Sequence, residues 1–483
     1  MVNLKKVLSL SLVSAMTLSI AGCSGNGGSD AKTTTAGNNS NDPTSSNEGP
    51  TAAPNVEVPD KTRVINIGTW YEHYYTSEHH EIDDQPKVTD RENAQMNLDN
   101  MRNIEQTYNV ELYFKNLTWD GVISSINTSI MAGTPDMDVY ETDLQFGVPA
   151  VMNGYAQAIS SYADPDDDIY KDQIIVEPLQ IDGLDDDYLF TGSSDLPVGL
   201  YALGFNMDMI KDANLENPQD LYDRGEWTWD KFLEYLQALT KDTDNDGKTD
   251  VYGYGGWWTT FLTYMLLSNG TDIASSPTSH LDSAATIETI QFIDDMYNKY
   301  QVARPWNEED WNINNDAYAS GEMAFWITAC WIADGMGDAD PSKVSFECGV
   351  VPFPKGPNVT KNGATYKSYN TSSNYYFIPK GIDDSKLVYK VVEQWINWFD
   401  GDVSLRDDSQ WWEGSVYSPN AENPERNYTY LVAAKKNATL DNWGNLDTGF
   451  SIVPIITGQT TTAQYIEENK QILQDALDTI FDK

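Results

Sequence analysis

The spacing of apolar residues predicts alternating strands and helices in the first part of the chain. Residues 63–68 (RVINIG) alternate between apolar and polar and end at a glycine, which indicates a strand. Apolar residues then recur at helical spacing from Ala94 to Tyr108. Further elements are expected in order: a strand over 110–117, a helix over 122–131 and a short strand over 138–140. Strands alternating with helices are typical of an α/β sheet with helices on its faces.

A second series of strand and helix patterns follows. Residues 199–206 (GLYALGFN) indicate a strand, and Thr228 is a candidate N-cap for the next helix. Either Asp282 or Ser283 is expected to cap a further helix. The remaining elements are predicted in order: strands over 322–328 and 346–353, a helix over 387–399 and a last helix over 465–481. The pattern therefore predicts two blocks of α/β structure.

The first 60 residues show a different pattern. Two lysines precede an apolar stretch over residues 7–21, which is shorter than the roughly 20 apolar residues of a membrane span and typical of a secretory signal peptide. Residues 18–23 (LSIAGC) resemble a bacterial lipobox, in which the signal, here 1–22, is removed and the cysteine, here Cys23, is lipidated. An ordinary signal peptide with a chance cysteine is the alternative.

The segment after this cysteine is rich in Gly, Ser, Thr, Asn and Pro. It has too few large apolar side chains to offset the entropy of ordering it. Residues 23–60 are therefore expected to be a disordered tether. Together with the lipobox, this places the folded body on the extracellular face of the cell membrane, attached by a lipid anchor alone.

Length and charge limit the class of protein. About 420 residues follow the tether, which is too long for one ordinary hydrophobic core, so two domains or lobes are expected. The formal net charge of the 483 residues is -44. Such a body repels phosphate backbones and anionic lipids, which argues against nucleic-acid binding and against membrane contact through the protein surface. We expect a monomer.

An acidic loop is the candidate metal site. Residues 242–250 (DTDNDGKTD) place oxygen ligands at positions 1, 3, 5, 7 and 9 and glycine at position 6, as in an EF-hand. The expected ligands are Asp242, Asp244, Asp246, the backbone carbonyl of Lys248, and Asp250. Gly253 stands where the last acid of an EF-hand belongs. A structural calcium ion is expected here, and a turn rich in Asp, Asn and Gly is the alternative.

The cysteines and histidines of the sequence indicate no metal site. Apart from Cys23, the chain has Cys330 and Cys348, which are able to pair outside the cell; whether they do is left open. Only four histidines occur, and no zinc-ligand spacing is present.

Aromatic residues are the unusual excess, with 15 Trp and 28 Tyr. Several lie in polar, loop-like stretches: Trp70, Tyr71, Trp257, Trp258, Trp306, Trp311, Trp411 and Trp412. Flat rings beside carboxylates and amides suit a pyranose sugar, whose C–H face stacks on the ring while its hydroxyls take hydrogen bonds. For each ring, packing in the core is the alternative.

Six stretches in the same order resemble the extracellular solute-binding proteins of family 1, which serve ABC sugar importers and are related to maltose-binding protein. They are residues 199–208 (GLYALGFNMD), 210–215 (IKDANL), 227–256 (which contains the acidic loop), 321–331 (GEMAFWITACW), 349–357 (GVVPFPKGP) and 373–381 (SNYYFIPKG). Each is weak alone, but together they span the body of the chain.

The resemblance implies a two-lobe α/β fold of the periplasmic-binding-protein type II, with a hinge and a central cleft. By this analogy, residues 61–201 with 374–401 form the N-terminal lobe and residues 202–373 with 405–483 the C-terminal lobe. It implies capture of a carbohydrate, and clustered Trp pairs favour an oligosaccharide. The closed form would be read by the membrane subunits of an ABC importer. The protein itself would catalyse no reaction.

Candidate ligand contacts come from two sources. The resemblance points to Trp331, Trp411 and Trp412 as stacking rings. The carboxyl ends of strands in an α/β sheet usually face the ligand, and there the sequence places Trp70, Tyr71 and Glu72 after the first strand and Tyr140, Glu141 and Asp143 at the third. Trp257 and Trp258 follow a glycine-rich turn over residues 252–256, near the cleft that the resemblance implies.

Two other functions share some of these features. A secreted glycoside hydrolase needs two carboxylates flanking a cleft, and acidic residues are too plentiful here to exclude a pair. However, no G-x-S-x-G or H-E-x-x-H motif occurs. A solute sensor that works with a membrane kinase would have the same fold as an importer's binding protein.

Overall fold

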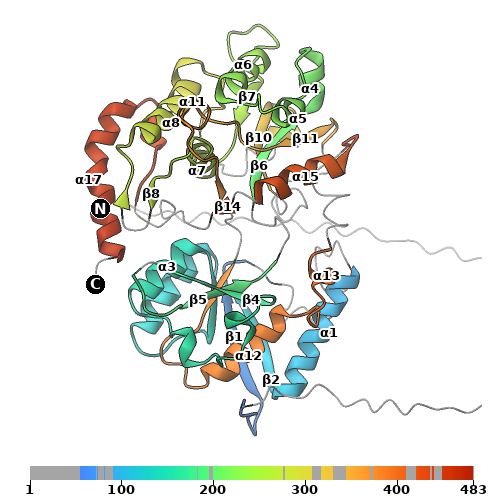
Figure 1. Cartoon of the computed structure of the whole chain (residues 1–483), viewed down its shortest axis with the longest axis vertical. Coiled ribbons are helices and arrows are strands. Elements are labelled where there is room, and N and C mark those ends of the chain that lie inside the picture. The colour runs from blue at the N-terminus through green and yellow to red at the C-terminus, as the bar shows by residue number, and fades with distance from the viewer. Residues whose placement is uncertain are drawn as a thin grey trace, which may run out of the picture. The chain divides into compact units, whose positions relative to one another are not determined.

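The computed structural model describes residues 55–71, 73, 81, 91–181, 183–194, 200–275, 278–306, 317–329, 344–369, 374–408, 420–435, 438–439 and 449–481. The ribbon is drawn in Figure 1. The predicted signal peptide, Cys23 and residues 24–54 of the tether lie outside these ranges. In the part of the chain that is described, no helix combines the length and the apolar character that crossing a membrane requires.

The first sheet has six strands in the order β2-β1-β3-β13-β5-β4. Their bounds are β1 Arg63–Thr69, β2 Val110–Asn116, β3 Val139–Thr142, β4 Val176–Leu179, β5 Leu189–Gly192 and β13 Tyr375–Phe377. β1 pairs in parallel with β2 and β3, so the carboxyl ends of these three strands meet at one edge. β13 pairs antiparallel with both β3 and β5, which brings Asn374, the residue before it, near the end of β3.

Several helices accompany this sheet: α1 Arg91–Tyr108, α2 Trp119–Ser125 with a π-helical turn η2 Ile126–Ile130, α3 Leu144–Met152, α12 Ser385–Ile396 and α13 Val403–Arg406. Single 3-10 turns, η3 Ile159–Ser161 and η4 Asp168–Tyr170, lie between α3 and β4. Leu98, Met101 and Ile104 of α1 share one buried cluster with Val388 and Val391 of α12. The predicted 3.6-residue spacing in α1 is confirmed as its buried face.

The second sheet has four strands in the order β11-β6-β10-β7. Their bounds are β6 Tyr201–Asn206, β7 Tyr252–Gly255, β10 Met323–Ala329 and β11 Cys348–Val351. β6 pairs antiparallel with β10 and β11, and β10 pairs in parallel with β7. Two short ladders join β8 (Ala274–Ser275) to β9 (Thr278–Ser279) and β12 (Ser368–Tyr369) to β14 (Ala438–Thr439).

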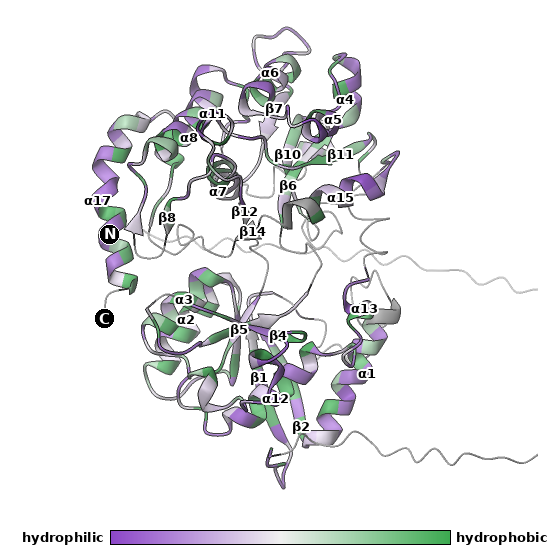
Figure 2. Ribbon diagram, in the orientation of Figure 1, coloured by the Kyte–Doolittle hydropathy of each residue, from purple (hydrophilic) through white to green (hydrophobic). Residues whose placement is uncertain are grey.

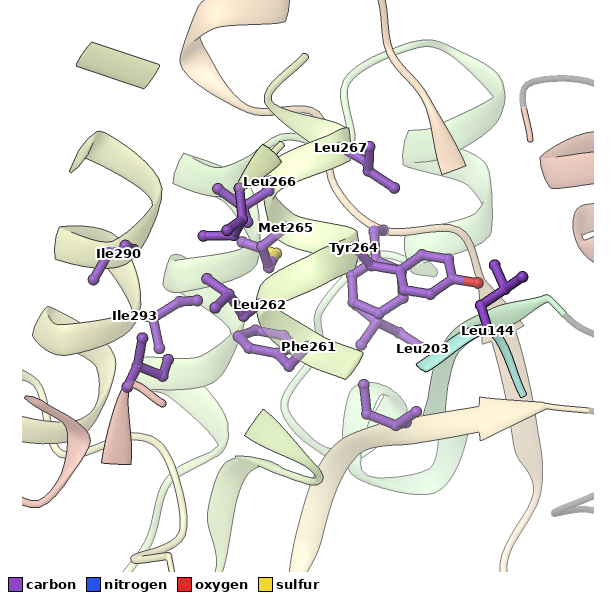
Figure 3. Packing of buried hydrophobic residues seen from close by; sticks show 14 of the residues in the cluster. Leu144, Leu203, Phe261, Leu262, Tyr264, Met265, Leu266, Leu267, Ile290 and Ile293 are labelled. Atoms are coloured by element: carbon purple, nitrogen blue, oxygen red, sulfur yellow. The ribbon is translucent and has the colours of Figure 1, made fainter. Parts of the chain in front are cut away.

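The helices grouped with the second sheet are α4 Met207–Asp212, α5 Pro218–Asp223, α6 Trp229–Leu239, α7 Trp258–Ser268, α8 Ala284–Asp294 with a π-helical turn η5 Asp295–Lys299, α11 Pro357–Asn362, α15 Pro424–Lys435, α16 Val453–Ile456 and α17 Thr462–Phe481. α7 is buried from Phe261 to Ser268 and is apolar on most sides. Figure 3 shows Leu262 of α7 lying toward Ile290 and Ile293 of α8. By contrast, hydrophobic and hydrophilic residues both occur along α17 in Figure 2, as expected of a helix with an exposed face.

The helix starts predicted from capping residues are confirmed. The Thr228 hydroxyl accepts a hydrogen bond from the Lys231 amide (3.4 Å) at the start of α6. Of the two candidates for the next cap, Ser283 is the one used, accepting from the Thr286 amide at 3.2 Å. β11 is shorter than predicted, because residues 346–347 and 352–353 do not join its pairing with β6.

The outer edge of β11 is covered by side-chain amides. The Asn427 carbonyl oxygen on α15 accepts from the Val350 amide (3.0 Å), and its amide donates to the Cys348 carbonyl (3.2 Å). Gln219 of α5 donates to the Val350 carbonyl (2.8 Å) and to Asn427 (2.7 Å). These bonds take the place of a further strand and satisfy an edge that would otherwise be open to pairing.

The α/β fold class predicted from the sequence is confirmed. β13 and α12 come from residues 374–401, which the resemblance assigns to the N-terminal lobe, and the strands of the second sheet come from residues 201–351. The lobe boundaries themselves stay a prediction.

Candidate functional site

Polar and aromatic side chains meet at the carboxyl ends of β1 and β3. The Tyr71 hydroxyl donates a hydrogen bond to Glu141 Oε1 at 2.7 Å. The Asn374 amide, at the start of β13, donates to the same oxygen and lies 3.4 Å from the Tyr71 hydroxyl. The Thr69 hydroxyl donates to the Tyr71 carbonyl at 2.7 Å and fixes the turn after β1. Three segments distant in sequence are thus joined at Glu141.

Glu141 is the most unusual group at this edge. It is 1% exposed, and its second oxygen, Oε2, has no hydrogen-bond partner among the described residues. Burial raises the pKa of Glu141 to about 7, although Tyr71, Asn374 and Tyr376 favour the charged form. Burial, reinforced by the charge of Glu141, also holds the pKa of Tyr71 well above its ordinary value. At neutral pH the carboxyl is therefore able to donate or to accept a hydrogen bond.

Trp70 brings an aromatic surface to the same edge. It is half-buried, and its ring meets the Tyr71 ring edge-to-face at a centroid distance of 5.6 Å. Of the predicted contacts near β1 and β3, the structure therefore brings together Trp70, Tyr71 and Glu141. Glu72 lies outside the described residues.

The other two candidates at β3 have structural contacts. Tyr140 is 0% exposed, stacks on Phe377 at 5.3 Å and shares a 2.8 Å hydrogen bond with the Ser125 hydroxyl. It therefore packs in the core. Asp143 caps α3, accepting from the Gln145 amide at 2.7 Å, and burial raises the pKa of its carboxyl.

Trp257 and Trp258 lie beside the second sheet, at the start of α7. Both are half-buried, and Trp257 meets Tyr201 of β6 edge-to-face at 6.4 Å. Trp258 packs against the hydrophobic cluster that contains α7. Trp331, Trp411 and Trp412 lie outside the described residues, as do Trp311 and Cys330. Cys348 is buried in β11, and burial raises the pKa of its thiol to about 12.

The acidic loop brings three predicted ligands together. One carboxylate oxygen from each of Asp242, Asp244 and Asp250 lies within 4.8 Å of the others. Backbone amides already bond to these carboxylates: Gly247 to Asp242 at 2.9 Å, Asp246 to Asp244 at 3.0 Å and Thr243 to Asp250 at 2.7 Å. The donor set is all oxygen, which is the chemistry that calcium prefers.

The two remaining predicted ligands are placed differently. The Asp246 carboxylate accepts from the Lys248 amide at 2.8 Å and lies 3.5 Å from the Lys248 ammonium group. Gly253 has a steric reason to be glycine, because a Cβ atom there would lie 2.6 Å from the Leu236 backbone in α6. The position-12 acid of an EF-hand has no room in this loop.

Asn374 is a member of the site that the sequence analysis missed. It lies more than 200 positions from Glu141, and only the pairing of β13 with β3 brings them together. No local pattern reports such a contact.

Comparisons with known proteins identify the family. A family model described as bacterial extracellular solute-binding protein matches residues 94–404, more than half of the chain. Comparison of the sequence with curated proteins found no match.

Solved structures share the fold at low identity. An ABC substrate-binding protein from Listeria monocytogenes in complex with cycloalternan is 14% identical, with 87% of this chain and 99% of that chain covered and a TM-score of 0.58. An acarbose-binding receptor from Streptomyces glaucescens is 14% identical (87% and 99% covered, TM-score 0.54). A maltose/maltodextrin-binding domain from Bdellovibrio bacteriovorus bound to maltotriose is 12% identical (86% and 97% covered, TM-score 0.52). The chain belongs to the bacterial extracellular solute-binding proteins.

Proposed function

We propose that this protein captures a carbohydrate, an oligosaccharide, outside the cell and presents it to the membrane subunits of an ABC importer. The family membership supports solute capture, and the structural relatives named above were solved with cycloalternan, acarbose or maltotriose. The observation that carries the proposal is the cluster of Trp70, Tyr71, Glu141 and Asn374 at the carboxyl edge of the first sheet.

The chemistry of this cluster matches that of a sugar. A pyranose has an apolar C–H face, which an indole such as that of Trp70 covers, and hydroxyls at its rim. The buried Glu141 carboxyl and the Tyr71 hydroxyl supply hydrogen bonds that a hydroxyl uses. In the mechanism we propose, the sugar gains further contacts only when two hinged lobes close, and that difference in affinity favours the closed state.

A glycan panel read by thermal shift tests this proposal. The processed protein, purified in detergent, is melted with glycans from monosaccharides to hexasaccharides. A ligand that binds only the folded state raises the melting temperature. We expect at least one oligosaccharide to do so for the wild type, and the Tyr71→Phe variant to show a smaller rise. Tyr162→Phe is the control, because that buried hydroxyl has no partner among the described residues. A panel without any hit contradicts carbohydrate capture.

We propose that binding is not followed by catalysis. A general acid needs a raised pKa, and the Glu141 carboxyl has one. Hydrolysis also needs a second carboxylate at about 5–9.5 Å. Long incubation with a bound glycan should leave its chain length unchanged on thin-layer chromatography. Release of shorter sugars at rates proportional to protein concentration would support a glycosidase instead.

We also propose that Cys23 carries the lipid anchor. The lipobox-like residues 18–23 support this. The wild type should fractionate with membranes, and its N-terminal peptide should carry the mass of fatty acyl groups. Cys23→Ser should move the protein to the soluble fraction. An unmodified Cys23 in the mature wild type contradicts the proposal.

A calcium ion in the acidic loop is a separate proposal. The three clustered carboxylates support it, since like charges so close together repel unless a cation or hydrogen bonds compensate them. Calcium should raise the melting temperature of the wild type after chelator treatment, and Asp242→Asn should reduce that rise. Asp408→Asn, a carboxylate outside the loop, should respond as the wild type does. Equal melting with chelator and with calcium contradicts a bound ion.

A further inference from the structure

Trp119 is a large exposed ring at the carboxyl edge of the first sheet. It is the first residue of α2, three positions after β2 ends, and it is 43% exposed. Single exposed apolar side chains are common, so exposure alone says little about its role.

The turn that carries Trp119 is built in detail. The Leu117 amide donates to the Thr69 carbonyl at 2.8 Å, which ties the turn to the end of β1. The Thr118 amide donates to Asn116 Oδ1 at 2.9 Å, and the Thr118 hydroxyl accepts from the Gly121 amide at 3.4 Å. Thr118 also has a φ of 65°, a conformation that costs energy for a non-glycine residue. These contacts fix the backbone from which the indole projects.

Neighbouring rings hold the indole itself. Trp119 meets Trp70 edge-to-face at a centroid distance of 5.9 Å, and Phe146 of α3 at 4.6 Å. Trp70 in turn contacts Tyr71, which bonds to Glu141. A continuous row of contacts therefore runs from the buried carboxyl, through two rings, to an exposed indole.

We propose that Trp119 forms an outer subsite, in which a second ring of an oligosaccharide stacks on its exposed indole. This inference rests on the proposed function, because it extends the same site. The inner part of the row, around Glu141, supplies hydrogen bonds that recognise one sugar unit. The outer indole of Trp119 supplies apolar contact area for a second sugar ring. Because this contact involves the C–H face of the sugar, it tolerates different patterns of sugar hydroxyls. Trp119 would therefore make affinity depend on the length of the glycan.

The test compares glycans of different length on matched variants. The probe is whichever panel oligosaccharide the wild type binds best, together with its monosaccharide and disaccharide. In Trp119→Ala, we expect affinity for the oligosaccharide to fall roughly tenfold and affinity for the monosaccharide to stay the same. Trp119→Phe, which keeps a smaller ring, should lose less. Tyr170→Ala is the control, since Tyr170 is 40% exposed and lies in η4.

A spectroscopic readout separates contact from folding effects. In protein labelled with fluorotryptophan, the fluorine resonance that disappears in Trp119→Phe belongs to Trp119. It should shift when the oligosaccharide binds and stay in place when the monosaccharide binds. Equal affinity of Trp119→Ala and the wild type at every length overturns the outer subsite and leaves the proposed function standing. An equal loss at every length also overturns it, because Trp119 then only supports Trp70. If the wild type binds no glycan, both proposals fail.

Discussion

Burial of the Glu141 carboxyl is the main feature of this site that destabilises the folded state. Its carboxyl is taken out of water, two donors share one of its oxygens, and the other oxygen has no partner among the described residues. Burying a polar group without compensation destabilises the folded state. Under the proposed function, a hydrogen bond from a ligand hydroxyl would offset part of this cost.

Glu141 should make stability depend on pH. Its pKa rises from 4.5 to about 7 on folding, so between these values the folded protein keeps a proton that the unfolded chain releases. Its contribution is therefore fully present below pH 4.5 and is lost as the pH rises through 7. The unfolding free energy of Glu141→Gln, relative to wild type, should increase by up to about 3 kcal/mol between acidic and slightly alkaline pH. Urea melts of both proteins across this range measure the difference.

Other carboxylates titrate in the same range, so the comparison with the wild type is what isolates Glu141. Asp143→Asn shows how much of the pH dependence at this edge comes from the other carboxyl whose pKa burial raises. A difference between Glu141→Gln and wild type that stays constant with pH would show that folding does not shift the pKa of Glu141.

At the residue scale, the sequence located one part of the site and missed another. Trp70, Tyr71 and Glu141 were found because residues that follow the first and third strands of a parallel sheet meet at one edge. Asn374 was missed because its position depends on β13 pairing across the sheet. Tyr140 was predicted for the same edge, but its side chain packs in the core against Phe377.

At the scale of elements, side chains complete the second sheet. β11 is the outer strand, and Asn427 and Gln219 bond to its free backbone groups. α15 and α5 are therefore joined to the sheet through buried hydrogen bonds as well as through apolar packing.

Removing the side-chain amide of Asn427 should destabilise the fold without changing the proposed ligand site. Asn427→Ala leaves the Val350 amide and the Cys348 carbonyl without their partner. Buried groups left unsatisfied cost about 2–4 kcal/mol in total. Asn362→Ala on α11, whose amide makes an exposed contact, should change stability by less than about 0.5 kcal/mol. Equal urea midpoints for the two variants would show that the edge bonds contribute little.

Local signals explain which elements were predictable. α6 and α8 have a capping residue and a helical apolar period, and both were placed within a few residues. The three-residue strand β13 has too short a pattern to be distinguished from a loop, and it exists because β3 and β5 pair with it. The resemblance placed this segment with the N-terminal lobe, but local periodicity did not.

At the scale of the whole molecule, charge is the dominant property. The net charge is -44, so the excess carboxylates repel one another and destabilise the compact state. Raising the sodium chloride concentration from about 10 mM to about 150 mM shortens the screening length from about 30 to about 8 Å. The melting temperature at neutral pH should therefore rise over this range. A fall would show that attractive ion pairs, such as Arg63 with Asp138, outweigh the repulsion.

Calorimetric titration of the wild type and a Trp70→Ala variant with the best glycan of the panel tests the central claim most directly. We predict micromolar or tighter binding to the wild type, a loss of at least about tenfold in Trp70→Ala, and wild-type affinity in the Tyr162→Phe control. Wild-type affinity in Trp70→Ala would contradict a carbohydrate site at the edge of the first sheet.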